Sequence, residues 1–294
     1  MRALSLLVIL AGCGAAEDDP KPTDTSSTQV TDDPRWDAST WPTEVGGGRE
    51  ADVRAPASWD GKSRLPVLFV LHGYGANAAA QDLYFQATAR VETDQVIVVL
   101  PDGKVDEGGS RFWNAASACC DFYGDGVDDV AYLTRLLDEV EESFPVDPER
   151  VYLVGHSNGG FMAHRLACEL GGRITAYASL AGGAEDRECA SGVASVLQLH
   201  GTADDTIPFD TNGWTLGAED SVQLAADRAG CTGTEAGGRA DYLLDTDGDE
   251  TVITRWSGCD AGFKAELWAF EGGGHIPLLN EASRDAMYGW LFAE

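Results

Sequence analysis

Short apolar runs alternate with amphipathic segments along most of the chain from about residue 50 onward. The apolar runs are too short for helices and lack clean polar alternation, which is typical of strands covered on both faces. They predict strands at 65–71, 95–100, 151–154, 176–180, 194–199 and 263–270. Apolar positions at helical spacing predict helices near 78–91, 127–143, 158–170, 217–229 and 281–293. This alternation predicts an α/β fold, with a mostly parallel sheet and helices on both of its faces.

The beginning of the chain does not follow this pattern. It reads MRALSLLVILAGC, in which one Arg and a short apolar run lead to small residues, as in an export signal. The run is too short to span a bilayer as a mature helix. Its end, LAGC, resembles the bacterial lipobox, which implies that Cys13 is the lipidated first residue of the mature protein. An ordinary secretory signal is the alternative.

A polar segment follows the signal. It is rich in Thr, Ser, Asp, Pro and Gly and has almost no large aliphatic residues, so it has little apolar surface to bury. We therefore expect a lipoprotein-type signal peptide at 1–12, a flexible acidic tether at 13–48 and a single α/β domain at 49–294.

Acidic residues dominate the charge of the chain. Asp and Glu number 49 against 20 Lys and Arg, a formal net charge of −29. Such a surface repels phosphate backbones and anionic lipid. We therefore expect no nucleic-acid partner and a membrane association only through a lipid on Cys13. A monomer is expected as well.

The motif with the clearest chemistry is Gly155-His156-Ser157-Asn158-Gly159, which has the form G-x-S-x-G. It stands between a predicted strand and a predicted helix, the context in which this motif makes a sharp turn that exposes the serine hydroxyl. The helix that follows also favours negative charge at its N-terminus. The sequence therefore predicts Ser157 as a nucleophile.

A serine nucleophile needs a base and an acid that orients the base. In a strand–turn–helix arrangement of this kind they follow the serine in the order acid, then His. His275, which follows three glycines, is the histidine that leaves room for an acid before it. The segment after the strand at 194–199 offers Asp204 and Asp205, and we expect Asp204 to be the acid.

Two backbone amides are needed to stabilise an oxyanion. The residue after the nucleophile, Asn158, supplies one, and Tyr74 in the loop after the strand at 65–71 is expected to supply the other. The Tyr74 ring and His156 are expected to line the substrate site. Trp113 has two interpretations, a cleft wall that stacks on substrate or a ring that packs its loop onto the core.

Six cysteines remain beyond Cys13, and an even number in an exported protein indicates disulfides. None of their spacings is a two-by-two zinc pattern, so we expect no metal at these residues. The acidic stretch at 245–250 departs from the EF-hand spacing, and we expect a hairpin turn there, with calcium as the alternative.

Several motifs occur together in order: HGYG, WN near a Cys pair, VDDV, GHSNGG, LACEL, HGTADDTIP and GGGH. Together they resemble the secreted polyhydroxybutyrate depolymerase and feruloyl esterase-like branch of the α/β hydrolases. The resemblance implies an α/β-hydrolase fold and a cofactor-free serine esterase. Its substrate would be a carboxylic ester outside the cytoplasm, either small or polymeric (a polysaccharide ester or a polyester), and the enzyme would be lipid-anchored to a bacterial envelope or secreted.

The resemblance also bears on the cysteines and on specificity. Cys231 and Cys259 match a later cysteine pair of the family, which implies a disulfide between them. Cys168 with Cys189 is the next expected pair, which leaves Cys119 and Cys120 as a vicinal pair or as free thiols. Many relatives have G-H-x-W-P-G around the catalytic His, whereas this chain reads GHIPL, so no specific substrate carries over.

Two other functions compete with an esterase. One is a serine peptidase similar to prolyl oligopeptidase, although nothing in the chain resembles the propeller domain of those enzymes. The other is a non-catalytic surface binding protein on a hydrolase scaffold, although such proteins usually lack one member of the Ser-His-Asp set.

Overall fold

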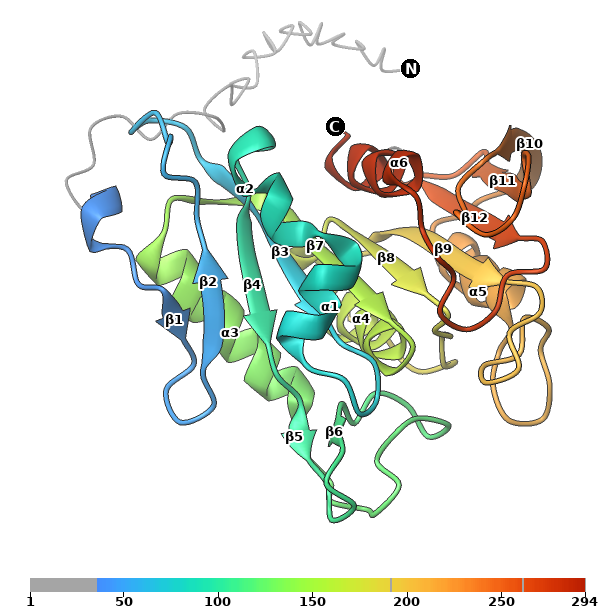
Figure 1. Cartoon of the computed structure of the whole chain (residues 1–294), viewed down its shortest axis with the longest axis horizontal. Coiled ribbons are helices and arrows are strands. Elements are labelled where there is room, and N and C mark those ends of the chain that lie inside the picture. The colour runs from blue at the N-terminus through green and yellow to red at the C-terminus, as the bar shows by residue number, and fades with distance from the viewer. Residues whose placement is uncertain (1–35, 191, 261, 294) are drawn as a thin grey trace, which may run out of the picture.

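The computed structural model describes residues 36–190, 192–260 and 262–293, and these build one layered α/β domain (Figure 1). Within this part of the chain, ten strands form one sheet in the order β1-β2-β4-β3-β7-β8-β9-β12-β11-β10. Their bounds are β1 (Glu44–Val45), β2 (Ala51–Arg54), β3 (Leu65–Leu71), β4 (Ile97–Pro101), β7 (Val146–His156), β8 (Ala176–Leu180), β9 (Ser195–Gly201), β10 (Gly233–Ala240), β11 (Thr251–Ser257) and β12 (Ala265–Phe270). A separate hairpin pairs β5 (Lys104–Val105) with β6 (Arg111–Phe112).

The middle of the sheet is parallel, from β4 through β3, β7, β8 and β9 to β12, and the strands outside it are antiparallel. The six apolar runs of the sequence account for these six central strands. All residues of β3, β4, β8 and β9 are buried, which explains why their sequences show no polar alternation.

Helices cover both faces of the sheet, as expected. Successive residues of β3 point into opposite cores: Val67 and Phe69 lie in one, Leu68 and Val70 in the other. Helices α3, α4 and α5 supply the first core, and α1, α2 and α6 supply the second (Figure 1). Their bounds are α1 (Ala78–Phe85), α2 (Arg90–Thr93), α3 (Asp129–Ser143), α4 (Asn158–Glu169), α5 (Ala218–Arg228) and α6 (Glu281–Phe292). The helix expected at 78–91 is thus divided, because Gln86 adopts a left-handed conformation that ends α1.

The folded domain begins earlier than the expected boundary at residue 49. The Trp41 ring packs 5.0 Å from the Trp59 ring and 5.3 Å from that of Phe144, measured between centroids. Glu44 and Val45 then pair with β2 at the edge of the sheet. The apolar Trp41 and Val45 therefore anchor a segment whose overall composition predicted a tether. The signal peptide and Cys13 lie outside the described residues.

The cysteines of the described domain form disulfides between Cys231 and Cys259, between Cys168 and Cys189, and between the neighbours Cys119 and Cys120. The first two are the expected pairs, and the third is the vicinal alternative. Among the described helices, none has both the length and the apolar character needed to cross a bilayer.

Candidate active site

Ser157 occupies a tight turn between β7 and α4. Its backbone has φ +53° and ψ −119°, a left-handed conformation that non-glycine residues rarely adopt. Neighbouring glycines make the turn possible. A Cβ on Gly155 would lie 2.2 Å from the Gly159 carbonyl oxygen, and a Cβ on Gly159 would lie 2.1 Å from the Leu71 carbonyl oxygen. The two glycines of G-x-S-x-G therefore let the strand, the turn and the helix approach closely.

Ser157, His275 and Asp204 form one hydrogen-bonded series. Nε2 of His275 lies 2.9 Å from Oγ of Ser157, and its Nδ1 lies 2.8 Å from Oδ2 of Asp204. A carboxylate only accepts, so Nδ1 carries the hydrogen and Nε2 is free to accept the serine proton. Asp205 does not touch the imidazole; its carboxylate lies 3.4 Å from the Thr206 hydroxyl. In this arrangement a histidine can act as a general base toward a serine.

Two loops at the same edge of the sheet bring these side chains together. Asp204 follows β9, and His275 follows the adjacent parallel strand β12. The Ala203 amide donates to the Gly273 carbonyl at 2.9 Å, and a Cβ on Gly201 would lie only 2.1 Å from that same oxygen. The glycines before His275 thus let its loop lie directly against the Asp204 loop.

The Asp204 side chain is fully buried, yet the structure favours its charged form. Burial raises the pKa of this carboxyl, but hydrogen bonds from His200, His275 and the amides of Ile207 and Thr206 outweigh it. Oδ1 accepts both amides at 2.9 Å. The pKa of Asp204 therefore lies well below its usual value, and the residue is a carboxylate at neutral pH.

Two amides near Ser157 have free donor capacity. Asn158 is the first residue of α4, where N–H groups have no intrahelical acceptor. Among the described residues, no acceptor lies within hydrogen-bond range of the Tyr74 amide. Tyr74 lies next to Gly73, whose Cβ position is 3.5 Å from the Ser157 Cβ. Both amides expected in an oxyanion hole are therefore beside the serine.

Trp113 does not line an open cleft. The residue is completely buried, and its indole N–H donates to the His72 carbonyl at 3.0 Å. Its main chain exchanges two hydrogen bonds with the Asn158 side chain, at 2.7 and 2.8 Å. Of its two interpretations, substrate stacking is wrong because no ring face is accessible, and Trp113 packs its loop against the start of α4.

His156 contacts the loop that carries His275. Its residue is 8 % exposed, and its Nε2–H donates to the His275 carbonyl at 2.9 Å. Burial lowers the pKa of His156 to about 4, so the imidazole is neutral. The Tyr84 hydroxyl, from α1, donates at 2.7 Å to the carbonyl of Pro277 in the loop of His275. These two side chains hold the loop of His275, so His156 supports that loop.

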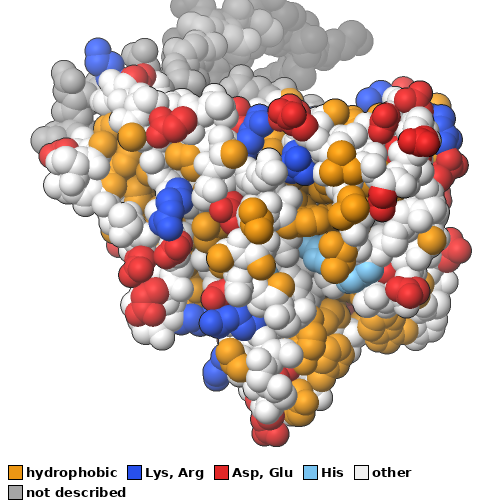
Figure 2. All heavy atoms as spheres, viewed as in Figure 1, with side chains coloured by type: hydrophobic (Ala, Val, Ile, Leu, Met, Phe, Trp, Pro, Cys, Tyr) orange, Lys and Arg blue, Asp and Glu red, His pale blue; other side chains and the backbone are white. Residues whose placement is uncertain are grey.

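The surface around the site is partly apolar. Figure 2 shows histidine side chains reaching the surface in a hollow bordered by hydrophobic groups. The Tyr74 ring, 37 % exposed, lies edge-on to the ring of Phe122, and its hydroxyl donates to Asp106 at 2.5 Å. Phe122 and Tyr123 are largely exposed, and sequence reasoning missed them because their stretch has no periodicity.

No metal site is evident in the described part of the chain, where no group of three or more His, Cys, Asp or Glu could hold an ion. The stretch at 241–250 joins β10 to β11, which are paired up to Ala240 and Thr251. The hairpin expected there is confirmed.

Comparisons with known proteins relate the chain to esterases. The model of the Esterase family, described as "Putative esterase", matches residues 43–213. The chain is 34 % identical over 231 residues to "Putative esterase NocK" of Nocardia uniformis subsp. tsuyamanensis, covering 71 % of this chain and 64 % of that protein. It is 26 % identical over 263 residues to feruloyl esterase B of Piromyces equi, covering 84 % of this chain and 45 % of that protein. The chain thus spans less than two thirds of either relative.

A solved structure shows the same fold. Acetyl xylan esterase from Aspergillus awamori superimposes with a TM-score of 0.59 at 12 % identity, covering 84 % of this chain and 98 % of that one. At this identity the likeness concerns the fold alone. It agrees with the α/β-hydrolase architecture expected from the sequence.

Proposed function

The chain belongs to the Esterase family, and on that premise we propose that it is a serine esterase that hydrolyses carboxylic esters. Ser157 is the nucleophile, His275 the general base and Asp204 the residue that orients His275; these three are called the triad below. The observation that carries the proposal is the 2.9 Å contact between His275 Nε2 and Ser157 Oγ, with Nδ1 of the same ring on a buried carboxylate.

The reaction proceeds in two halves. Ser157 Oγ attacks the ester carbonyl while His275 Nε2 takes the hydroxyl proton, and the resulting imidazolium gives that proton to the departing alcohol. This leaves an acyl group on Ser157. A water molecule then attacks the acyl carbonyl, His275 takes its proton and returns it to Ser157 Oγ, and the carboxylic acid leaves.

The negative oxygen that forms in each half is stabilised by the amides of Tyr74 and Asn158. Two arguments support this assignment: both amides lie beside Ser157, and neither has an acceptor of its own among the described residues. Asn158 is also the first residue of α4, where the helix dipole favours negative charge.

For the substrate we propose esters of plant cell-wall type, feruloyl or acetyl groups on a polysaccharide. The support is that two relatives are named as a feruloyl esterase and a bifunctional acetylxylan esterase/xylanase. The exposed rings of Tyr74, Phe122 and Tyr123 offer an aromatic surface that begins at the loop whose Tyr74 amide is assigned to the oxyanion, and such a surface suits a planar acyl group.

A fluorophosphonate probe tests the catalytic proposal. Wild-type protein should be labelled at Ser157, and Ser157→Ala should be unlabelled and lose ester hydrolysis by a factor of about 10⁴ or more. Equal labelling of the two proteins would refute the assignment. A panel of methyl ferulate, acetylated xylan, p-nitrophenyl acetate and polyhydroxybutyrate then tests the substrate proposal.

We also propose that the enzyme works outside the cytoplasm, anchored by a diacylglyceryl group on Cys13. The three disulfides of the described domain support an oxidising compartment. The expected result of Cys13→Ser is an active enzyme released from the membrane fraction, without incorporation of labelled palmitate. Wild-type protein that takes up no palmitate and begins beyond residue 13 would replace lipidation with plain secretion.

A further inference from the structure

A buried series of hydrogen bonds, separate from the one through His275, leads to Asp204. Nε2 of His200 lies 2.9 Å from the Ile207 carbonyl oxygen and 3.4 Å from Oδ2 of Asp204. Both of these oxygens can only accept, so Nε2 of His200 carries a hydrogen. The His200 side chain is fully buried between these partners, where no solvent can replace them.

The contacts of Nδ1 of His200 fix the same tautomer, the one with the hydrogen on Nε2. The Gln198 amide nitrogen lies 3.2 Å from Nδ1 of His200 and 3.0 Å from the Gly182 carbonyl oxygen. An amide NH₂ only donates, so Nδ1 of His200 is the acceptor and carries no hydrogen. The Nε2–H of His200 is therefore directed at the loop that carries Asp204.

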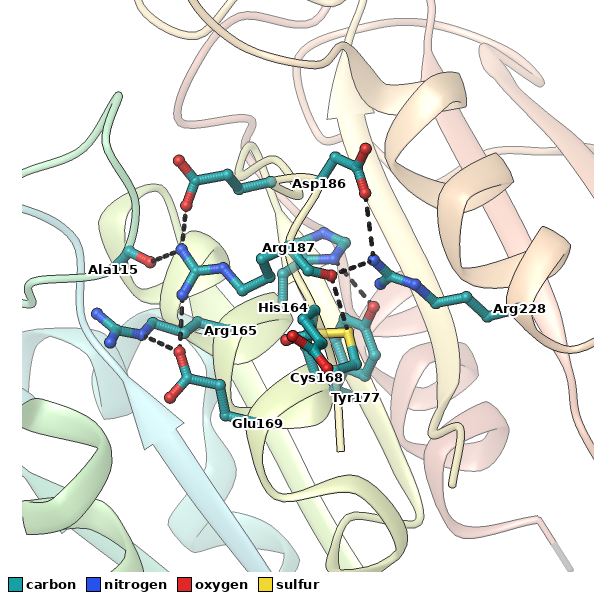
Figure 3. Close-up of a disulfide and its surroundings, with 12 residues drawn as sticks. Ala115, His164, Arg165, Cys168, Glu169, Tyr177, Asp186, Arg187 and Arg228 are labelled. Atoms are coloured by element: carbon teal, nitrogen blue, oxygen red, sulfur yellow. Dashed lines mark hydrogen bonds and ion pairs between the residues drawn. A yellow bond between two sulfur atoms is a disulfide. The ribbon is translucent and has the colours of Figure 1, made fainter. Parts of the chain in front are cut away.

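The series continues through two more side chains, His164 of α4 and Tyr177 of β8. The Gln198 carbonyl oxygen accepts from Nε2 of His164 at 3.0 Å, and Nδ1 of His164 accepts from the Tyr177 hydroxyl at 2.9 Å. Burial lowers the pKa of His164 to about 4, so this ring is neutral. Figure 3 shows His164 and Tyr177 beside Cys168, which forms a disulfide with Cys189.

Every group in the series donates in the same direction, from Tyr177 through His164 and Gln198 to His200. Bonds aligned in this way polarise one another in a low-dielectric interior. The last donor, Nε2–H of His200, contacts the loop of Asp204 at two points. It binds the carbonyl of Ile207, whose amide holds Oδ1 of Asp204, and it approaches Oδ2 of Asp204 directly.

We propose that His200 is a positioning residue of the triad: its Nε2–H, fixed in that tautomer by Gln198, holds Asp204 in the orientation that receives Nδ1–H of His275. This inference rests on the proposed esterase function. It gives a role to a histidine whose place at the end of β9 otherwise indicates only a structural residue.

Three substitutions distinguish the effect of the Nε2–H donor of His200 from the effect of its ring. His200→Gln keeps an N–H near the Nε2 position, His200→Asn places its amide near Nδ1, and His200→Phe keeps only a ring. Turnover of p-nitrophenyl acetate is measured for each, with thermal melting to show that the variant is folded. We expect kcat of His200→Phe and His200→Asn to fall about tenfold or more with KM within twofold, and His200→Gln to keep kcat within about threefold.

The comparison decides the matter even if the Phe variant does not fold, because the two amide variants are matched in polarity. Equal kcat of His200→Gln and His200→Asn overturns the donor role, as does a rise of KM in place of a fall of kcat. Ser157→Ala is measured in parallel. If it retains full turnover, the proposed function and this inference both fail; if it is inactive while His200→Phe is fully active, only the positioning role fails.

Discussion

The substitution Asp204→Asn is the sharpest test of the proposed mechanism, because the structure dictates how the new amide must sit. Oδ1 of Asp204 accepts the amides of Thr206 and Ile207, both at 2.9 Å. In the variant, the amide oxygen must take that place, since an NH₂ group there would face two donors. The NH₂ group then takes the Oδ2 position, where it points at Nδ1 of His275. It also faces the more distant Nε2–H of His200, 3.4 Å away, which keeps the Ile207 carbonyl as its acceptor.

A donor in that position reverses the tautomer of His275. Nδ1 must lose its hydrogen to accept from the amide, so the hydrogen moves to Nε2 and no lone pair faces Ser157 Oγ. The base is then absent at neutral pH, and we expect kcat to fall about 10⁴-fold, equivalent to about 5 kcal/mol of transition-state stabilisation. KM should change little, because Asp204 is buried away from the substrate.

The assay is initial-rate hydrolysis of p-nitrophenyl acetate, and Asp205→Asn is the matched control. The control removes the same charge one residue away, from an exposed carboxylate whose contact is the Thr206 hydroxyl at 3.4 Å. It should stay within about twofold of wild type. A kcat of Asp204→Asn within tenfold of wild type, or a larger loss in the control, would refute the reasoning.

Three further predictions concern stability and the turn. The pKa of His164 is lowered to about 4, so the folded protein binds fewer protons at this ring than the unfolded chain does. The contribution of His164 to the free energy of unfolding is fully present above about pH 6.5, and about 3 kcal/mol of it is lost as the pH falls toward 4. Urea unfolding from pH 7.5 to 4.5 should show this loss, and less of it in His164→Gln. Replacing Cys231 and Cys259 by Ala opens a loop of sequence separation 28 and should cost about 3 to 4 kcal/mol in the same assay; no change after mild reduction of the wild type would contradict this. Gly155→Ala places a Cβ 2.2 Å from a carbonyl oxygen of α4 and should lower both stability, by about 1 to 3 kcal/mol, and kcat, whereas Gly172→Ala, with open space around its Cβ position, should leave kcat unchanged.

The central sheet could be predicted from the sequence because burial on both faces leaves a visible apolar run in each strand. The edge strands could not. β10 reads GTEAGGRA and is mostly exposed, so neither hydrophobicity nor alternation marks it; its partner β11 supplies the pairing. β1 is only two residues long, and Val45 is its one buried position. These strands exist because the sheet offers them hydrogen bonds, which a local pattern does not contain.

The same division applies to the candidate site. Ser157 and His275 stand in glycine-rich turns whose geometry leaves a local sequence signature, and Asp204 follows from chain order. The two interpretations of Trp113 could not be separated from the sequence because they differ in burial. A tryptophan beside a loop looks like a substrate contact until the structure shows what covers it.

The net charge of the chain makes the surroundings of Asp204 more informative. In a molecule with a formal charge of −29, an ionised buried carboxylate needs stabilisation, and among the described residues no Lys or Arg pairs with Asp204. The stabilisation comes from neutral donors, two backbone amides and two imidazoles, all within 3.4 Å. Such short, buried contacts are screened little by salt, unlike exposed ion pairs. The charge that orients His275 is therefore set by local hydrogen bonds from β9, from the turn after β9 and from the loop after β12, and it is largely independent of the acidic surface.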